Sequence, residues 1–138
     1  MPRKDRIHEA VKNALVKDGW TITDDPYRIE YEEADVYADL RIEKGSAGPA
    51  QRRVLVIEIK EFAVVSPMNR LEEALGQYQV YRSYLRQTAP DEQLYLAVDK
   101  ASHDALFSRK SFQRIVADYH LALVVVDILQ EEVVEWIN

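Results

Sequence analysis

The apolar run "RRVLVIEIKEF" at residues 52–62 constrains the fold more than any other part of the chain. A short run this rich in Val, Leu and Ile predicts a strand, and apolar residues on both faces predict a central place in a covered sheet. The run ends with Glu58 and Lys60. The two-residue period of a strand puts both charges on one face, roughly 6–7 Å apart. Because either charge is costly to bury alone, we expect a partner or an ion beside them.

The remaining sequence alternates between helical and strand-like patterns. Helices are predicted over about 4–17, 66–87 and 109–119. Strands are predicted over 20–23, 27–31, 34–43, 53–60, 93–99, 121–127 and, as an edge strand, 131–137. The first two strands are expected to form either a short pair or one bent strand. This order predicts a single α/β domain over residues 1–138, with a mixed sheet flanked by helices.

Two of the predicted helices carry clear terminal signals. Gly19 is expected to close the first helix. Ser66 suits the N-cap of the second helix, and Pro67 suits its first position. Apolar residues at helical spacing form a stripe along the second helix: Met68, Leu71, Leu75, Tyr78 and Leu85.

Residues 34–43, "ADVYADLRIE", alternate between apolar and polar side chains. The apolar face comprises Val36, Ala38, Leu40 and Ile42, and Asp39 lies on the polar face. The Gly- and Pro-containing stretch 43–53 predicts a long hairpin loop to the next strand. If the two strands pair across this loop, Asp39 can approach Glu58.

Two adjacent carboxylates repel each other unless one is protonated or a cation lies between them. Mg²⁺ would relieve this repulsion, because it accepts one or two carboxylates, a backbone carbonyl and waters. Asp39 and Glu58 are therefore candidate metal ligands, and Ile59 is the candidate carbonyl donor. Lys60 could activate or orient an attacking water and stabilise the charge that develops on a phosphoryl group. Together these residues predict hydrolysis of phosphodiesters.

This arrangement has the spacing of the PD-(D/E)xK nucleases. In these enzymes an acidic residue on one strand precedes, across a variable loop, a (D/E)-x-K on the next strand, and a helix follows. The E-x-K triplet at 58–60 is a more specific signal than the triplet alone, because it lies at the end of an apolar strand. The alternative is that Glu58 and Lys60 form an ion pair at the strand end, with Asp39 on the surface.

Two further residues are candidates for the same site. Nucleases of this class often carry a glutamate on the first helix, where Glu9 falls. However, Glu9 lies opposite the apolar stripe of its helix, and His8 fits the position equally well. Gln77 on the second long helix could reach the site or a phosphate, although it could also be an ordinary surface glutamine.

Composition excludes several classes of function. The chain has no cysteine, which excludes disulfides, thiolate zinc sites and cysteine nucleophiles. A net charge of −6 argues against a protein that coats nucleic acid electrostatically. It does not exclude a nucleic-acid enzyme, because metal-binding carboxylates themselves contribute negative charge. The sequence shows no signal peptide and no apolar run approaching about 18 residues, so we expect a cytoplasmic protein without membrane contact.

The sequence resembles the XisH family of cyanobacteria, the fdxN-element excision controlling factors. The segments that carry the resemblance are "HEAVKNALVKDGWTITDDPY", "ADL", "VLVIEIKEF", "ALGQYQVYRSYL" and the terminal "VVVD" and "VVEWI". Together they extend over essentially the whole chain, and "DGWTIT" and "EIK" are the most specific.

The resemblance implies a restriction-endonuclease-like fold and a role in programmed DNA excision, in which a separate recombinase breaks the strands. It also implies a small XisI-like partner protein. Matched by position, Asp39 and Glu58 are the expected ligands of Mg²⁺ or Mn²⁺, and Lys60 is the expected catalytic lysine. Two functions remain open: a metal-dependent DNA endonuclease or nickase, and a nuclease-fold regulatory protein that acts through its partner without hydrolysis. The apolar edge strand at 131–137 could support a homodimer.

Overall fold

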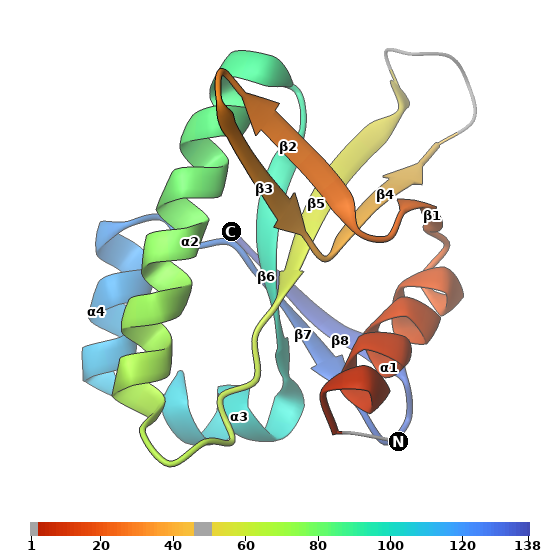
Figure 1. The fold of residues 1–138 in the computed structure, drawn as a ribbon. Coiled ribbons are helices and arrows are strands. Elements are labelled where there is room, and N and C mark those ends of the chain that lie inside the picture. The colour runs from red at the N-terminus through yellow and green to blue at the C-terminus, as the bar shows by residue number, and fades with distance from the viewer. Residues whose placement is uncertain (1–2, 46–50) are drawn as a thin grey trace.

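A six-stranded mixed sheet with the strand order β1-β4-β5-β6-β7-β8 forms the centre of the molecule (Figure 1). The computed structural model describes residues 3–45 and 51–138. The helices are α1 (Arg3–Lys17), α2 (Pro67–Thr88), α3 (Lys100–Leu106) and α4 (Lys110–Asp118). The strands are β1 (Thr21–Asp24), β2 (Tyr27–Tyr31), β3 (Ala34–Ala38), β4 (Leu40–Lys44), β5 (Arg53–Ile59), β6 (Gln93–Asp99), β7 (Leu123–Asp127) and β8 (Glu132–Ile137).

The strand directions confirm the predicted mixed sheet. Strands β5, β6 and β7 are parallel, and the crossovers between them run through α2 and through α3 with α4. Strand β4 is antiparallel to both of its neighbours, β1 and β5, and β8 adds an antiparallel edge beside β7. The predicted pairing across the 43–53 loop is confirmed by the β4–β5 register, although residues 46–50 of that loop lie outside the described residues.

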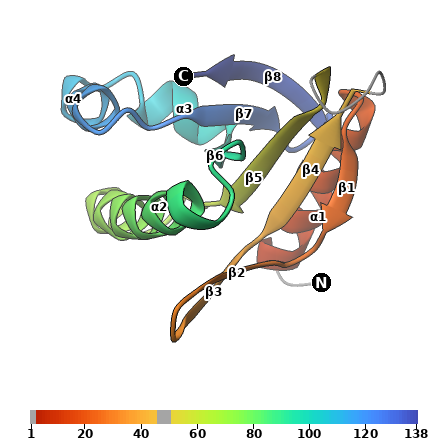
Figure 2. The ribbon, with the colours of Figure 1, turned by 90° about the horizontal axis from the view of Figure 1, so that it is seen from above.

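Helices cover both faces of the sheet. Helices α2, α3 and α4 pack on one face and α1 on the other (Figure 2). Successive residues of β5 therefore enter different cores: Val56 belongs to the α2 side and Ile57 to the α1 side. Burial on both sides explains why this strand is almost entirely apolar, and it confirms the central position predicted for it.

The predicted continuous strand over 34–43 is wrong, because the chain bends at Asp39. The first half, β3, leaves the main sheet and pairs with β2 in a separate two-stranded sheet. Strands β1 and β2 consequently do not pair with each other, and β1 pairs with β4 instead. Ala38 and Leu40 are both fully buried, but they face opposite cores. Alternation in sequence cannot reveal such a bend, because both halves keep an apolar side.

Helix α2 confirms the predicted N-terminal signal and corrects its apolar face. Ser66 is the N-cap, and its hydroxyl accepts a hydrogen bond from the Asn69 amide at 3.4 Å. Met68, which was predicted to be in the stripe, is 43% exposed. The buried residues of the helix are Leu71, Ala74, Tyr78, Tyr81 and Leu85. None of the helices in the described part of the chain, including this longest one, combines the length and the apolar character that crossing a membrane requires.

Helix α3 was not predicted from the sequence. It has only seven residues, and its N-cap is Asp99, whose side chain accepts a hydrogen bond from the Ser102 amide. The predicted terminal edge strand is confirmed as β8. Its pairing with β7 is interrupted by a bulge, and its burial alternates only weakly. A bulge and exposed glutamates are features that protect a sheet edge from pairing with another chain.

Gly19 closes α1 as predicted. Its φ of 97° lies in the left-handed region, and the Trp20 amide donates a hydrogen bond back to the Leu15 carbonyl at 3.0 Å. A Cβ at this position would also lie 3.1 Å from Cε of Lys44. Gly76 is the opposite case, because it lies within α2 and a Cβ there would meet no atom within 4 Å.

We predict that these two glycines respond to alanine with opposite signs. Gly19→Ala should lower the free energy of unfolding by about 1–2 kcal/mol, because a Cβ is strained at positive φ. Gly76→Ala should raise it by about 0.5–1 kcal/mol, because alanine favours a helix interior. Urea unfolding of the two variants and the wild type measures both changes. Equal destabilisation by both substitutions would contradict the assignment of these two backbone conformations.

Candidate metal-ion site

The site lies where the β4–β5 ladder ends. The register pairs Leu40 with Ile57, so the next residues along the ladder, Asp39 and Glu58, lie opposite each other. At this point side chains replace the backbone pairing. The Asp39 amide donates to Glu58 Oε1 at 3.2 Å, and the Ile59 amide donates to Asp39 Oδ2 at 2.7 Å. These two bonds end the ladder and bring two carboxylates together.

Glu58 is a buried carboxyl group. Only 6% of the residue is exposed, and burial is the main reason why its pKa rises to about 8. The negative charge of Asp39 raises this pKa further. The ammonium group of Lys60 and the hydrogen bond from the Asp39 amide act in the opposite direction, but they do not outweigh the burial. In the absence of a bound cation, Glu58 therefore keeps its proton well above the ordinary range of a glutamate.

Lys60 points to the same face as Glu58, as predicted. Its Nζ lies 3.8 Å from Glu58 Oε2 and 3.8 Å from Oε1 of Glu73 on α2, and the side chain is only 10% exposed. Its backbone amide donates to the Ala97 carbonyl of β6 at 3.0 Å, which fixes the chain at the end of β5. Two residues later, Phe62 is buried against the rings of Phe107 and Phe112. The lysine is thus held between a central strand and a buried aromatic anchor.

Helix α2 faces the site with Glu73, Gln77 and Tyr81, which are four residues apart and so share one side of the helix. Tyr81 is 8% exposed, and its hydroxyl donates to the Tyr37 carbonyl at 3.2 Å. Burial raises the pKa of Tyr81, the charges of Glu58 and Asp39 raise it further, and a hydrogen bond from Gln77 lowers it. The structure therefore places Gln77 beside Tyr81 and Tyr81 close to both carboxylates.

The sequence analysis missed Glu73 and Tyr81. Extending the position of Gln77 by one helical turn in each direction would have identified both. Tyr81 is hard to identify as a site residue from the sequence, because a tyrosine in an amphipathic helix is ordinarily explained by packing in the core.

The backbone of Ile59 also faces the site. Its amide points to Asp39, whereas the neighbouring amide of Lys60 points to β6. Because the N–H and C=O of one strand residue point to the same side, the Ile59 carbonyl faces the side of Asp39. Asp39 Oδ1 and Glu58 Oε2 are not used in the two ladder-ending bonds. In the described part of the chain, no group of three or more His, Cys, Asp or Glu residues is placed to hold a metal ion.

The structure does not bring Glu9 or His8 to these carboxylates. Helix α1 packs on the face of the sheet opposite to that of Glu58. Glu9 is 54% exposed and lies 3.9 Å from Lys12, and His8 contacts Asp25 at 2.8 Å. The accessory role predicted for Glu9 is therefore corrected. Its position in sequence matched the pattern, but the orientation of α1 carries it away.

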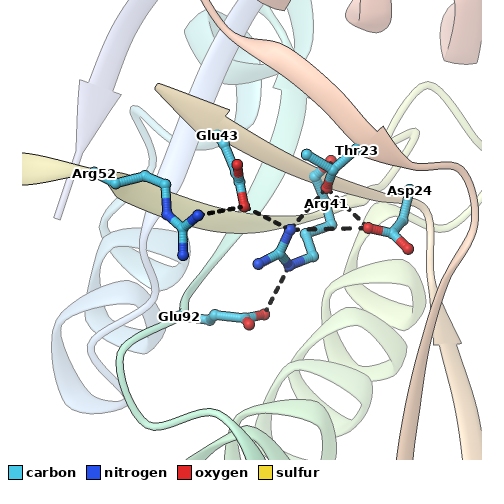
Figure 3. Close-up of polar contacts among 6 residues, drawn as sticks. All are labelled: Thr23, Asp24, Arg41, Glu43, Arg52 and Glu92. Carbon is cyan, nitrogen blue, oxygen red and sulfur yellow. Dashed lines mark hydrogen bonds and ion pairs between the residues drawn. The ribbon is translucent and has the colours of Figure 1, made fainter. Parts of the chain in front are cut away.

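A second polar cluster on β4 serves as a contrast (Figure 3). Arg41 lies 2.9 Å from Glu43 and 3.4 Å from Glu92, and it donates to the Thr23 hydroxyl at 2.9 Å. Its guanidinium group therefore joins β1, β4 and the residue before β6. Each charged group in this cluster lies within 3.9 Å of an opposite charge, although Oε1 of Glu92 is buried and receives no hydrogen bond from the described residues. The cluster is therefore a structural network of paired charges.

We predict that Glu58 makes the stability of the metal-free protein depend on pH. Between its ordinary pKa of 4.5 and its folded value of about 8, the folded protein holds a proton that the unfolded chain has released. The free energy of unfolding should therefore fall as the pH rises through this interval. Glu58→Gln lacks this penalty, so its melting temperature relative to wild type should rise from pH 5 to pH 9.

Glu72→Gln, on the exposed side of α2, is the matched control and should show no such trend. If Glu58→Gln melted below wild type at pH 9, Glu58 and Lys60 would be a stabilising ion pair and the carboxylate repulsion would be refuted.

Known proteins resemble this chain over nearly its full length. Residues 1–134 match the protein family described as XisH protein. A crystal structure of an XisH family protein from Nostoc punctiforme is 31% identical, with a TM-score of 0.88, and the match covers 97% of this chain and 100% of that one. A crystal structure of an fdxN element excision controlling factor protein from Anabaena variabilis is 35% identical, also with a TM-score of 0.88, and covers 97% and 99%. None of the curated proteins matches the chain. The chain belongs to the XisH family.

Proposed function

We propose that the protein hydrolyses phosphodiester bonds in DNA with Mg²⁺ or Mn²⁺, as a PD-(D/E)xK nuclease of restriction-endonuclease-like fold. Asp39, Glu58 and the Ile59 carbonyl would hold the cation, and Lys60 would act beside it. The observation that carries the proposal is that Asp39 and Glu58 lie opposite each other at the end of β5, each carboxylate bonded to a backbone amide of the other segment, with a nearly buried ammonium 3.8 Å from Glu58.

The donor set fits a hard divalent cation. Carboxylate and carbonyl oxygens are the ligands that Mg²⁺ prefers, together with waters. Gln77 adds a buried Oε1 for which the described residues supply no hydrogen-bond donor. A water of a hydrated cation could supply such a donor. The charges fit as well, because burial and the charge of Asp39 raise the pKa of Glu58, and a cation between the two carboxylates offsets both effects.

The protein residues divide the chemical work. A bound divalent ion supplies an acidified water and positive charge near the phosphate. Asp39 and Glu58 orient whatever lies between them, because each is fixed by a backbone amide. Lys60 offers three N–H donors beside Glu58, where it can orient an attacking water or stabilise negative charge on the phosphoryl oxygens. For this Lys60 must exchange its contact with Glu73, which is itself 60% exposed and also lies 3.8 Å from Arg70.

The family supplies the context for the substrate. The relative from Anabaena variabilis is described as an fdxN element excision controlling factor protein. We propose that this chain likewise acts on DNA during a programmed rearrangement, and that cleavage or nicking is its contribution. The Asp39–Glu58–Lys60 constellation supports this over a purely structural role, because buried charges without full compensation are costly and cluster at functional sites.

A second candidate function is control of excision without hydrolysis, through a small XisI-like partner. The charge distribution favours it. The chain carries a net charge of −6, and the β2–β3 hairpin beside the site exposes Glu30, Glu32, Glu33 and Asp35. An acidic surface repels phosphates and suits a basic partner protein.

We predict that the purified protein nicks supercoiled plasmid in the presence of Mn²⁺. Glu58→Ala and Lys60→Ala should each lower the rate at least about 100-fold, because the loss of one group that stabilises the transition state typically has that effect. Gel electrophoresis of the plasmid measures the rate. Glu72→Ala is the control that should keep it. Activity retained in Glu58→Ala would reveal a contaminating nuclease, and an inactive wild type would favour the partner-dependent function.

We further predict that Mn²⁺ stabilises the protein without DNA. A ligand that binds only the folded state raises the free energy of unfolding, by about 2.7 kcal/mol at a concentration 100 times its Kd. Because the cation must displace the proton of Glu58, the rise in melting temperature should be larger at pH 8 than at pH 6. Asp39→Asn and Glu58→Gln should abolish the rise, and Glu72→Gln should retain it. A rise that survives in Asp39→Asn would place the cation elsewhere.

A further inference from the structure

We propose that Tyr81 is a positioning residue that holds Asp39 in place for cation binding, an inference that builds on the function proposed above. Its hydroxyl donates to the Tyr37 carbonyl at 3.2 Å, two residues before Asp39 and 44 residues away in sequence. The bond links α2 to the end of β3, just before Asp39.

Asp39 needs such a support because it lies between two sheets. On its C-terminal side β4 continues the main sheet, and on its N-terminal side β3 pairs only with β2. The hydrogen bonds of the main sheet therefore fix the chain after Asp39 but not the chain before it. The direction of the chain before Asp39 depends on how the β2–β3 hairpin packs on α2, beside which it lies in Figure 1.

The surroundings of Tyr81 indicate a role as a hydrogen-bond donor in addition to packing in the core. The residue is 8% exposed, and a buried hydroxyl is costly unless it is hydrogen-bonded. Tyr84, three residues further along α2, stacks its ring on Tyr31 of the hairpin, with the ring centroids 5.3 Å apart. The hairpin thus rests on α2 through an apolar stack near its tip and through a directional bond near Asp39.

Gln77 extends this connection by one residue. Its side chain lies near enough to the Tyr81 hydroxyl to lower the pKa of Tyr81 as a hydrogen-bond donor, and a donor there leaves the hydroxyl free to donate its own proton to the Tyr37 carbonyl. The connection runs from Gln77 through Tyr81 to the backbone of β3. This gives Gln77 a role behind Tyr81, in addition to its buried Oε1, which receives no hydrogen bond from the described residues.

The chain contains a matched control for Tyr81. Tyr78 lies on the same helix, is 2% exposed, and donates through its hydroxyl to the Leu94 carbonyl at 3.1 Å. It also accepts a hydrogen bond from the Ala122 amide at 3.2 Å. Tyr78→Phe therefore removes a buried hydroxyl from α2 as Tyr81→Phe does, but its partners lie on β6 and before β7. A general loss of stability affects both variants, whereas a displaced Asp39 affects only one.

The test combines two measurements on wild type, Tyr81→Phe and Tyr78→Phe. The first is hydrogen exchange of the Asp39 and Ile59 amides in metal-free protein, relative to the Trp20 amide, which bonds to the Leu15 carbonyl at the end of α1 and has no contact with either tyrosine among the bonds given above. The second is Mn²⁺ affinity by calorimetry. Tyr81→Phe should speed the relative exchange at least about tenfold and weaken Mn²⁺ about tenfold, since residues that orient metal ligands typically act on affinity 10–100-fold. Tyr78→Phe should change neither more than about twofold.

The outcomes separate this inference from the function on which it builds. If wild type binds no Mn²⁺, the proposed metal site fails, and the exchange measurement still decides whether Tyr81 positions Asp39. If wild type binds Mn²⁺ and Tyr81→Phe leaves both the affinity and the relative exchange unchanged, the inference about Tyr81 is refuted while the metal site stands. Equal effects of the two tyrosine variants would likewise refute it, because they would reflect general loosening of the helix.

Discussion

The reciprocal pair of hydrogen bonds between Asp39 and the end of β5 determines the architecture around the site. Each bond joins a carboxylate of one chain segment to a backbone amide of the other. A regular ladder would have used two carbonyls in their place. Substituting carboxylates ends the sheet, turns β3 out toward α2, and leaves two acidic groups face to face. The break in the fold and the chemistry of the site thus have one origin.

The molecule treats its buried charges in two different ways. Around Arg41 each carboxylate lies within 3.9 Å of a guanidinium group, and these contacts tie β1, β4 and the residue before β6 together. Around Glu58 two carboxylates lie against each other and share one ammonium that also contacts Glu73. Paired charges add rigidity, whereas a buried carboxyl group that faces another carboxylate lowers stability as soon as it ionises. A position that weakens the fold needs another reason to exist, and ligand binding is such a reason.

How far the sequence predicted these features depends on whether the signal is local. The apolar run of β5, the N-terminal signal of α2 and the triplet at 58–60 are local patterns, and the structure has the strand, the start of the helix and the neighbouring charges where they were expected. The approach of Asp39 to Glu58 followed from one assumption about pairing. The bend at Asp39 could not be predicted, because neither the two carboxylate–amide bonds nor the packing of the hairpin on α2 is a local pattern. The same is true of Glu9, whose place depends on which face of the sheet α1 covers.

Tyrosines connect these non-local features. Tyr31 and Tyr84 stack where the hairpin meets α2, and Tyr81 reaches the backbone of β3 from the same helix. Aromatic rings bury much apolar surface with few rotatable bonds, and the hydroxyl adds a direction that packing alone lacks. A helix that covers the sheet can therefore also set the angle at which a neighbouring hairpin leaves it. Asp39 lies where the hairpin leaves the main sheet. A change in how the hairpin packs on α2 must therefore also change the distance between the carboxylates of Asp39 and Glu58.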